Sequence, residues 1–400
     1  MRYLGLLPLL TLAQDTLRVV AYNLLFYGST GPFCDAGCKE QNLKKIFNYT
    51  RPHLIGINEI SPNPLWFRRI LDSVLNVGGV SYWRSSIYGN VAGGNLVSAV
   101  FYDSRRLGWL GQQLITTQGN LRDIYAYHFY YKDPTLRPGS DTLYLVVIVP
   151  HLKAGNSSSD AQQRRRACED IRRYVQNLPS PRKFVIQMGD HNFYTASEAG
   201  YQELRQVLID PGPTGDWSGN SAFAYFHTQS TRLAYLPDDG IGGGLNDRFD
   251  FIFFSPACTS QTEKLRYVPG SFKVIGQDGQ HFGQAINAAP LPTGYPSDLI
   301  EALYTMSDHL PVYAEFALAV TPAVSLTFTA KRPEIFYRVG EGYLYITAQE
   351  PLRLRLVDVM GKVWADLMVE SATPYHINVP PGVYFLQEGE GSLVGKVFVP

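Results

Sequence analysis

Polar side chains with catalytic potential follow or precede apolar runs at several separate places in this chain. They are Asn23 after VVAY, Glu59 after LIGIN, His151 after LVVIVP, Asp190 and Asn192 in MGDHN, Asp250 in RFDFIFF, and Asp308 and His309 before PVYAEFAL. Because neighbouring strands of an α/β sheet release their polar groups at one edge, we expect these side chains to line one cleft. Carboxylate and amide oxygens suit a hard divalent cation, and histidines can move protons near neutral pH. The residue types predict metal-assisted hydrolysis.

The elements that must position these residues alternate between strands and helices from Arg18 to about Phe316. Residues 38–50 and 64–76 carry apolar side chains at helical spacing, whereas SAVFYD, TLYLVVIV, KFVIQMGD and PVYAEFAL are almost continuously apolar. Strands of that kind are covered on both faces. The sequence predicts an α/β fold in which two packed β-sheets are flanked by helices.

The composition changes after Phe316. Residues 324–400 contain short alternating segments such as LRLRLVDV and VYFLQEG, separated by turn signals at Met360-Gly361 and Pro380-Pro381-Gly382. This pattern predicts a small C-terminal all-β sandwich, joined through a linker at Thr321-Pro322. We therefore expect a catalytic domain over residues 15–320 and a second domain over residues 321–400.

Six short motifs carry a family resemblance. AYN, INE, PHLKAG, MGDHN, NDRFDFI and MSDHLPV occur in this order and resemble the endonuclease/exonuclease/phosphatase superfamily over residues 18–318. That superfamily includes deoxyribonuclease-I-like nucleases, sphingomyelinases and inositol-phosphate phosphatases. The resemblance implies a four-layer α/β/β/α sandwich and a metal-dependent phosphodiester hydrolase.

The resemblance also implies which residues bind the metal ion. Glu59 is similar to the acidic ligand of Mg²⁺, or of Mn²⁺ or Ca²⁺ in its place, with Asn23 assisting it. Asp308 resembles a second carboxylate on the metal side.

The remaining roles concern the phosphate and the protons. Asp190 and Asn192 resemble the pair that positions the phosphate and the attacking water. His309, polarised by Asp250, resembles an acid/base histidine, and His151 resembles the partner histidine that contacts the scissile phosphate. In the deoxyribonuclease-I branch a Glu supports this second histidine, but NLVSAVFYD has no carboxylate at Asn95, Leu96 or Ser98. We therefore expect His151 to be the less well oriented of the two histidines.

Charge and cysteine content limit the partners and the compartment. Lys and Arg total 35, as do Asp and Glu, which argues against a protein that coats DNA but leaves a local basic groove possible. The arginine run at 164–166 is predicted to lie on a solvated helix face. Cys34 and Cys38 are close enough for a local disulfide, whereas Cys168 and Cys258 could pair or remain core residues.

The chain termini point to export. Residues 1–14 have one Arg, then an apolar run from Tyr3 to Ala13, which predicts a secretory signal peptide; a buried first strand is the alternative. In the C-terminal domain, VDVMGKVW, VPPGVYFLQ and GKVFV resemble the sorting domain of the type IX secretion system, although a generic surface-binding sandwich shares such patterns. We expect a secreted or cell-surface protein that contacts secretion machinery and has no stable membrane insertion.

Three functions compete on the sequence alone. The favoured one is an extracellular endonuclease that hydrolyses DNA or RNA, because PHLKAG and the export signals resemble the extracellular nuclease branch. A phospholipid or sphingomyelin phosphodiesterase would use the same core residues, and an exposed aromatic loop beside the cleft would favour it. A non-catalytic surface-binding protein is the alternative from another class.

Overall fold

The computed structural model describes residues 15–29, 31–134, 136, 141–318, 335–340, 343–348, 351–358, 361–369, 375–388 and 392–399. By their internal contacts the residues divide into two compact units, Met1–Ala323 and Val324–Pro400. The predicted signal peptide, residues 1–14, and the predicted linker at 321–322 lie outside the described residues.

Two mixed sheets form the centre of the larger unit. The seven-stranded sheet contains β1 (Asp15–Tyr27), β2 (Leu54–Ile60), β3 (Trp83–Ser85), β4 (Val97–Asp103), β10 (Leu265–Tyr267), β11 (Lys273–Val274) and β12 (Val312–Leu318). Its order is β10-β12-β1-β2-β4-β3, with β11 also paired to β12, and only β1 and β2 run parallel. The five-stranded sheet contains β5 (Leu107–Thr116), β6 (Ile124–Tyr131), β7 (Tyr144–Ile148), β8 (Phe184–Asp190) and β9 (Asp250–Phe254), in that order.

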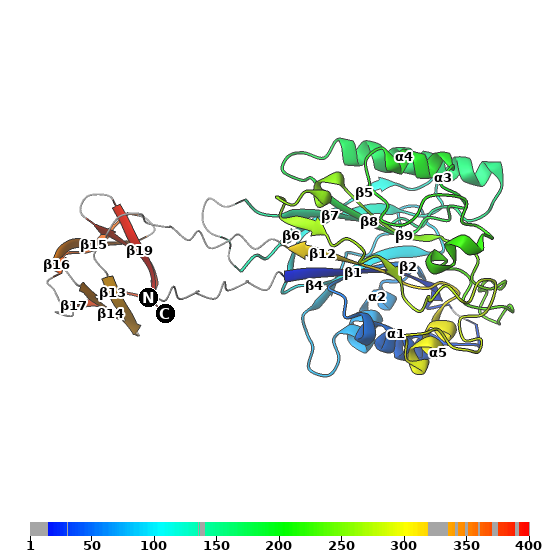
Figure 1. Cartoon of the computed structure of the whole chain (residues 1–400), viewed down its shortest axis with the longest axis horizontal. Coiled ribbons are helices and arrows are strands. Elements are labelled where there is room, and N and C mark those ends of the chain that lie inside the picture. The colour runs from blue at the N-terminus through cyan, green and yellow to red at the C-terminus, as the bar shows by residue number, and fades with distance from the viewer. Residues whose placement is uncertain are drawn as a thin grey trace, which may run out of the picture. The chain divides into compact units, whose positions relative to one another are not determined.

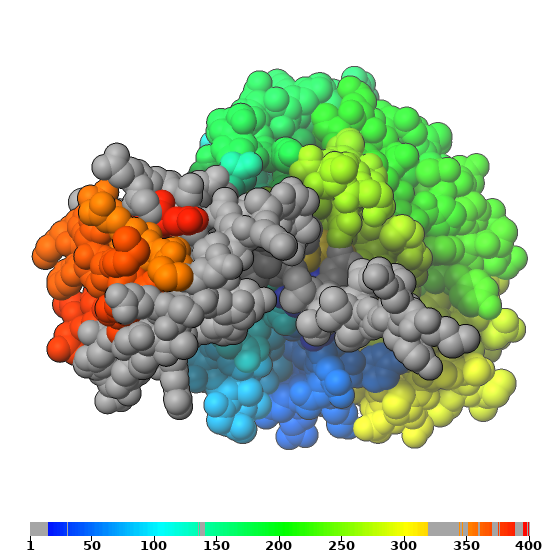
Figure 2. All heavy atoms as spheres, turned by 60° about the vertical axis from the view of Figure 1, so that its left-hand side comes forward, coloured from blue at the N-terminus to red at the C-terminus, as the bar shows by residue number. Residues whose placement is uncertain are grey.

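Helices cover the outer faces of the two sheets (Figure 1). The first sheet is covered by α1 (Ala36–Thr50), α2 (Pro64–Ile70) with the π-helical turn Leu71–Leu75, and α5 (Ser297–Met306). The second sheet is covered by α3 (Ser158–Gln176) and α4 (Ala199–Arg205), and short 3₁₀ turns occur at Ser221–Phe226 and Pro256–Thr259. The space-filling view shows the α3–α4 segment and the α1–α5 segments on opposite sides of this unit (Figure 2). The predicted four-layer fold class is confirmed.

Side chains on the two faces of each strand contribute to two separate apolar cores. On β7, Leu145 and Val147 belong to the core between the sheets, whereas Val146 and Ile148 pack in the core beneath α3 and α4. The sheets approach each other closely at Gly56 of β2, where a Cβ would lie 3.0 Å from the side chain of Met188 of β8. This period-2 pattern is why the strands read as nearly continuous apolar runs.

Two parts of the larger unit differ from the sequence predictions. Strands β5 and β6 are not among the predicted strands, because their apolar residues are interrupted by polar ones and β5 lies at a sheet edge.

The prediction of a solvated arginine face is wrong for Arg164, whose side chain is 1% exposed. Its guanidinium pairs with Glu198 and donates to the carbonyls of Lys153 and Gly155, so its charge is satisfied internally.

The cysteines separate into two kinds. Cys34 and Cys38 form a disulfide, as predicted. Cys168 and Cys258, whose pairing the sequence leaves open, are buried free thiols.

The smaller unit consists of two antiparallel sheets. One has the order β13-β14-β17, and the other has the order β16-β15-β18-β19. Their bounds are β13 (Ile335–Gly340), β14 (Tyr343–Ala348), β15 (Leu352–Asp358), β16 (Val363–Val369), β17 (Tyr375–Asn378), β18 (Gly382–Glu388) and β19 (Ser392–Val399). Buried side chains of both sheets, among them Leu344 and Leu354, share one apolar cluster. The predicted C-terminal all-β sandwich is confirmed.

Within the described residues, no helix combines the length and the apolar character that crossing a bilayer requires.

Candidate active site

The ends of β1 and β2 deliver Asn23 and Glu59. The β1–β2 register shifts between Asn23 and Tyr27, and the β2–β4 register shifts between Ile57 and Ile60. Glu59 itself has φ +62°, a left-handed conformation that is uncommon for a non-glycine residue. Irregular pairing of this kind re-aims side chains at a sheet end. Both residues therefore point away from the regular pleat and toward each other.

One amide links the central carboxylates. Nδ2 of Asn23 donates to Oε1 of Glu59 at 2.9 Å and to Oδ2 of Asp190 at 3.0 Å. Its Oδ1 accepts from the main-chain N–H of Leu25 at 2.9 Å, which fixes the orientation of the amide. Asn23 therefore holds together two acidic groups that lie 131 residues apart in the sequence.

His151 completes a compact acidic group. Its Nε2 lies 3.7 Å from Oε1 of Glu59 and 3.5 Å from Oδ2 of Asp190. Its Nδ1 is buried and has no hydrogen-bond partner among the described residues. Ser98 occupies part of the region where a supporting carboxylate was expected, but it accepts from Asn58. The predicted lack of support for His151 therefore appears in the geometry.

His309 stands on the other side of Asp190. Its Nδ1 lies 2.7 Å from Oδ2 of Asp250, and its Nε2 lies 3.8 Å from Oδ2 of Asp190. Both Asp250 and His309 are buried. A carboxylate at Nδ1 fixes the ring orientation and favours the imidazolium, so the structure places these two residues in the contact that an acid/base histidine requires.

Asn192 and Asp190 are positioned by a tight turn after β8. Oδ1 of Asp190 accepts from the main-chain N–H of Asn192 at 3.1 Å and from its Nδ2 at 2.8 Å. The residue before them, Gly189, has φ +148°, and a Cβ there would lie 2.4 Å from the carbonyl oxygen of Pro150. Only glycine permits this close approach. Asn58 Oδ1 accepts from the N–H of Asp190 at 2.9 Å and ties the turn to β2.

Asp308 is not part of the compact group of Glu59, His151 and Asp190, although its negative charge adds to burial in raising the pKa of Glu59. Its Oδ2 accepts from Gln229 Nε2 at 3.2 Å and from the main-chain N–H of Ile241 at 2.9 Å. The same Gln229 nitrogen lies 2.7 Å from Nε2 of His309. In this structure Asp308 is therefore joined to His309 through Gln229, while its Oδ1 has no hydrogen-bond partner among the described residues.

Burial and neighbouring charges shift the pKa values of the two central acids and of the two histidines. Burial raises the pKa of Glu59 and raises that of Asp190 to about 7. Burial also lowers the pKa of His151 well below its usual range, and the positive charge of Arg122 adds to the effect. For His309, burial favours the neutral form, but neighbouring carboxylates, led by Asp250, outweigh it and raise the pKa well above the usual range. The pKa values of the two histidines are therefore shifted in opposite directions.

The donor set fits a divalent cation. The ligand atoms of Glu59, His151 and Asp190 lie within 4.8 Å of one another. Two carboxylates with an imidazole suit Mn²⁺ as well as Mg²⁺, since carboxylates serve hard cations and imidazole suits transition metals. A cation would also remove the cost of burying two carboxylates side by side. Of the predicted metal-side residues, Glu59 lies in this group, Asn23 borders it, and Asp308 does not belong to it.

Two residues at the site have no sequence motif. Arg122, in the turn between β5 and β6, donates from Nη1 to the carbonyl oxygen of Leu152 at 3.2 Å, and Asn192 Nδ2 donates to the same oxygen at 3.3 Å. Gln229 bridges Asp308 and His309. Both residues come from irregular loops, where neither periodicity nor strand-end position could have marked them in the sequence.

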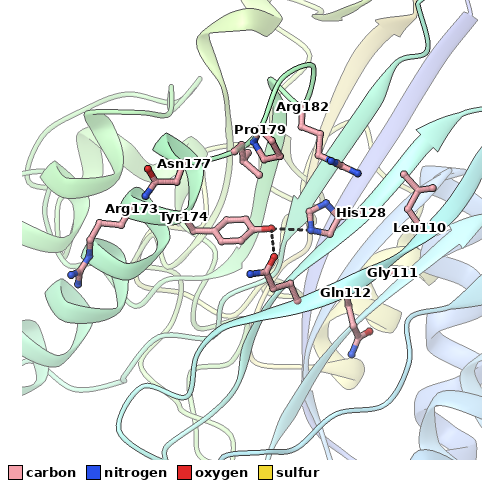
Figure 3. Close-up of a pocket in the computed structure, with 11 residues that line it drawn as sticks. Leu110, Gly111, Gln112, His128, Arg173, Tyr174, Asn177, Pro179 and Arg182 are labelled. Carbon is pink, nitrogen blue, oxygen red and sulfur yellow. Dashed lines mark hydrogen bonds between the residues drawn. The ribbon is translucent and has the colours of Figure 1, made fainter.

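A cavity of about 550 Å³ lies elsewhere, against the outer face of the five-stranded sheet (Figure 3). It is lined by residues of β5, β6 and the end of α3, including His128, Tyr174 and Arg182, and by none of the predicted site residues. His128 Nε2 lies 2.8 Å from the hydroxyl of Tyr174. The chemistry-bearing residues are therefore identified by their mutual geometry and not by cavity size.

This chain resembles known proteins in its backbone fold and not in its overall sequence. No family model matches the chain, and no curated protein sequence matches it. Among the solved structures that resemble it, TDP2 from D. rerio, complexed with single-strand DNA product, is 16% identical, with a TM-score of 0.47 over 76% of this chain and 99% of its own. An endonuclease/exonuclease/phosphatase protein from Bacteroides vulgatus is 14% identical, with a TM-score of 0.48 over 76% of this chain and 100% of its own.

A third similar structure covers more of the chain. It is an endonuclease/exonuclease/phosphatase protein from Beutenbergia cavernae, 13% identical, with a TM-score of 0.45 over 96% of this chain and 99% of its own. The structures that resemble this chain thus include named members of the family whose motifs the sequence resembles. At these identities the likeness assigns no substrate.

Proposed function

We propose that this chain is a secreted, divalent-metal-dependent phosphodiesterase and that its substrate is nucleic acid. The observation that carries the proposal is the position of Asp190. Its Oδ2 lies 3.5 Å from His151 and 3.8 Å from His309, within one group that also contains Glu59. An acid, a base and a candidate metal site are thus available around one point.

Hydrolysis of a phosphodiester assigns a task to each of these groups. A cation held by Glu59, Asp190 and His151 would neutralise negative charge on the nonbridging phosphate oxygens. The carboxylate of Asp190 accepts a proton from the attacking water as the new P–O bond forms. His309, whose pKa is raised by Asp250 and the neighbouring carboxylates, donates a proton to the departing alkoxide as the old P–O bond breaks. Asn192 holds the Asp190 carboxylate in place through its amide.

The substrate class rests on the motifs and on Arg122. PHLKAG resembles the extracellular nuclease branch, and the Arg122 guanidinium adds a positive charge beside Asn192, where a phosphate would sit. Export is proposed from residues 1–14 and from the C-terminal domain, whose strand-and-turn pattern resembles a type IX sorting domain.

A second candidate function has one observation in its favour. The loop that contains Ile241 presents three exposed apolar side chains, Leu233, Tyr235 and Ile241, with exposed fractions of 60%, 75% and 48%. This loop adjoins the site, because the Ile241 N–H donates to Asp308. Exposed apolar side chains beside a phosphodiesterase site can contact lipid, so a phospholipid phosphodiesterase is the alternative.

An activity screen tests the proposal. Purified protein is incubated with plasmid DNA, RNA, sphingomyelin vesicles and a phosphomonoester, with Mg²⁺ or Mn²⁺ and with excess EDTA. We expect cation-dependent cleavage of DNA or RNA. Cleavage of sphingomyelin alone would replace the proposed substrate with the lipid alternative, and no turnover on any substrate would favour a non-catalytic surface-binding protein.

A further inference from the structure

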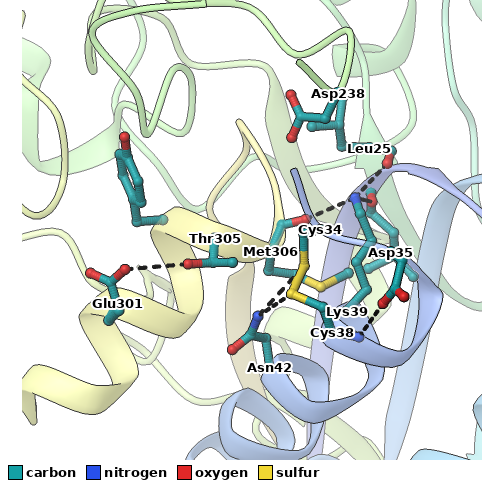
Figure 4. The surroundings of a disulfide bond; sticks show 12 residues. Leu25, Cys34, Asp35, Cys38, Lys39, Asn42, Asp238, Glu301, Thr305 and Met306 are labelled. Carbon is teal, nitrogen blue, oxygen red and sulfur yellow. Dashed lines mark hydrogen bonds between the residues drawn. A yellow bond between two sulfur atoms is a disulfide. The ribbon is translucent and has the colours of Figure 1, made fainter. Parts of the chain in front are cut away.

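Lys39 is a fully buried lysine in the first turn of α1. Its Nζ donates to the main-chain carbonyls of Leu24 at 2.6 Å, Leu25 at 2.6 Å and Met306 at 2.9 Å (Figure 4). The side chain is 0% exposed, and no carboxylate hydrogen-bonds to it among the described residues. A buried ammonium is costly unless its protons are accepted, and here three acceptors match three protons. The lysine is thus a connector between main-chain segments.

Two of these carbonyls belong to the irregular end of β1. Leu25 and Phe26 have φ of +48° and +49°, which is strained for residues with side chains. Their N–H groups serve the site directly, because Leu25 N donates to Asn23 Oδ1 and Phe26 N donates to Glu59 Oε2 at 3.1 Å. By holding the carbonyls of this turn, Lys39 fixes the N–H groups that orient Asn23 and Glu59.

The third carbonyl belongs to the segment that leads to His309. Met306 ends α5, and the next residue, Ser307, donates from Oγ to the carbonyl of Asn23 at 2.8 Å. The Ser307 hydroxyl also accepts from the N–H of His309 at 3.1 Å. Lys39 and Ser307 therefore join the same two segments, which carry the candidate metal side and the acid/base side.

The start of α1 is itself fixed. The Cys34–Cys38 disulfide closes the turn immediately before Lys39, and Asp35 Oδ1 accepts from the N–H of Cys38 at 2.9 Å as the helix N-cap. Asn42 Nδ2 lies within 3.9 Å of both sulfurs. The backbone position of Lys39 is therefore constrained, because the disulfide limits how far the first turn of α1 can move.

We propose that Lys39 is a positioning residue for the active site, which sets the separation of the Glu59 carboxylate and His309 through the Leu24–Leu25 and Met306 carbonyls. Its effect on turnover rests on the proposed function, whereas its effect on metal affinity rests only on the cation site formed by Glu59, His151 and Asp190. Lys39 touches neither substrate nor metal in this assignment.

The test compares Lys39→Met, which keeps the length and removes the donors, with Lys39→Gln, which keeps an amide donor. Lys45→Met, at an exposed position of the same helix, is the matched control. Mn²⁺ affinity is measured by calorimetry, and kcat and KM are measured on DNA, on full-length chains shown by circular dichroism to be folded. We expect Lys39→Met to lose about 10–100-fold in Mn²⁺ affinity, as for other groups that orient ligands, with kcat reduced and KM nearly unchanged. Lys39→Gln should recover part of the loss.

The outcomes separate this inference from the proposed function. If folded Lys39→Met binds Mn²⁺ as the unsubstituted chain does, the positioning role is wrong whatever the substrate proves to be. If Lys39→Met does not fold, the Lys39→Gln affinity decides. If the unsubstituted chain binds Mn²⁺ but cleaves no phosphodiester, the proposed function fails while the affinity comparison still tests Lys39.

Discussion

Nδ1 of His309 lies 2.7 Å from Oδ2 of Asp250, whereas Nδ1 of His151 is buried with no hydrogen-bond partner among the described residues. The first ring is held in one orientation by a carboxylate, and the second is held only by packing and by its contacts at Nε2. Because a carboxylate also favours the imidazolium, the two histidines differ in the direction of their pKa shift as well as in their hydrogen bonding at Nδ1.

The different surroundings of His309 and His151 predict different losses of kcat when each is substituted. His309→Ala should cost more in kcat than His151→Ala, within the roughly 10²–10⁴-fold that general acid or base catalysis contributes. Asp250→Asn should resemble His309→Ala, because the amide does not stabilise the charged ring. All three are compared at saturating metal on one substrate, with His281→Ala as the control, because the His281 ring contacts Asp278 and the carbonyl of Ala288 and none of these site residues. A larger loss for His151→Ala would mean that another group orients His151.

Removal of the acidic ligand should abolish metal-dependent turnover. Glu59→Gln keeps the shape of the side chain but removes a charge that a divalent cation needs. We expect near-complete loss of activity and weaker Mn²⁺ binding by calorimetry, with the circular dichroism spectrum unchanged. The surface substitution Glu301→Gln is the control and should retain both properties. Full activity of the unsubstituted chain in excess chelator would show that the chemistry needs no cation.

A glycine at the site should resist substitution. A Cβ on Gly189 would meet the Pro150 carbonyl at 2.4 Å and Asn58 Oδ1 at 2.8 Å, at φ +148°. Gly189→Ala should lower the free energy of unfolding by about 1–3 kcal/mol, since strained backbone carries costs of that order, and should displace Asp190. Gly111→Ala, at φ +134° with open space around it, separates the effect of φ from the clash. Equal losses in urea denaturation would show that the close approach is unimportant.

The larger unit should lose stability in mild acid. Burial, with the positive charges of Arg106 and Arg18, lowers the pKa of His53 to about 4. Between pH 6.5 and 4 the unfolded chain binds a proton that the folded chain does not, so the free energy of unfolding falls as the pH is lowered. The loss approaches roughly 3 kcal/mol at the lower end. His53→Asn should flatten this dependence in urea titrations at pH 7 and 4.5, and parallel curves for the two proteins would contradict the assignment.

The C-terminal unit should be dispensable for catalysis. All of the candidate site residues lie between Asn23 and His309, within the unit that ends at Ala323, and the smaller unit has its own apolar cluster. A chain ending at Val320 should therefore keep its kcat and KM. A folded but inactive truncation would show that residues 324–400 contribute to the site.

Most strands of the larger unit, and the polar residues at their ends, are predictable from the sequence alone. Apolar runs such as KFVIQMGD predicted β8, because a strand covered on both faces must be apolar throughout, and Asp190 was predictable at its end. The pairing of Asp250 with His309 followed from the family resemblance, and the structure places the two in contact. Strand β5 was not predictable, since its edge position leaves no continuous apolar run.

Which polar side chains form hydrogen bonds with each other depends on the tertiary fold and is not visible in the sequence. Lys39 gives no signal in the sequence, because a lysine on an amphipathic helix is expected in solvent, and only the close approach of β1 and α5 supplies its three acceptors. The same holds for Arg164, which the sequence placed in solvent, and for Gln229 and Arg122 on irregular loops. Hydrogen bonds between residues far apart in the chain depend on packing and loop closure, and local sequence patterns carry no record of either.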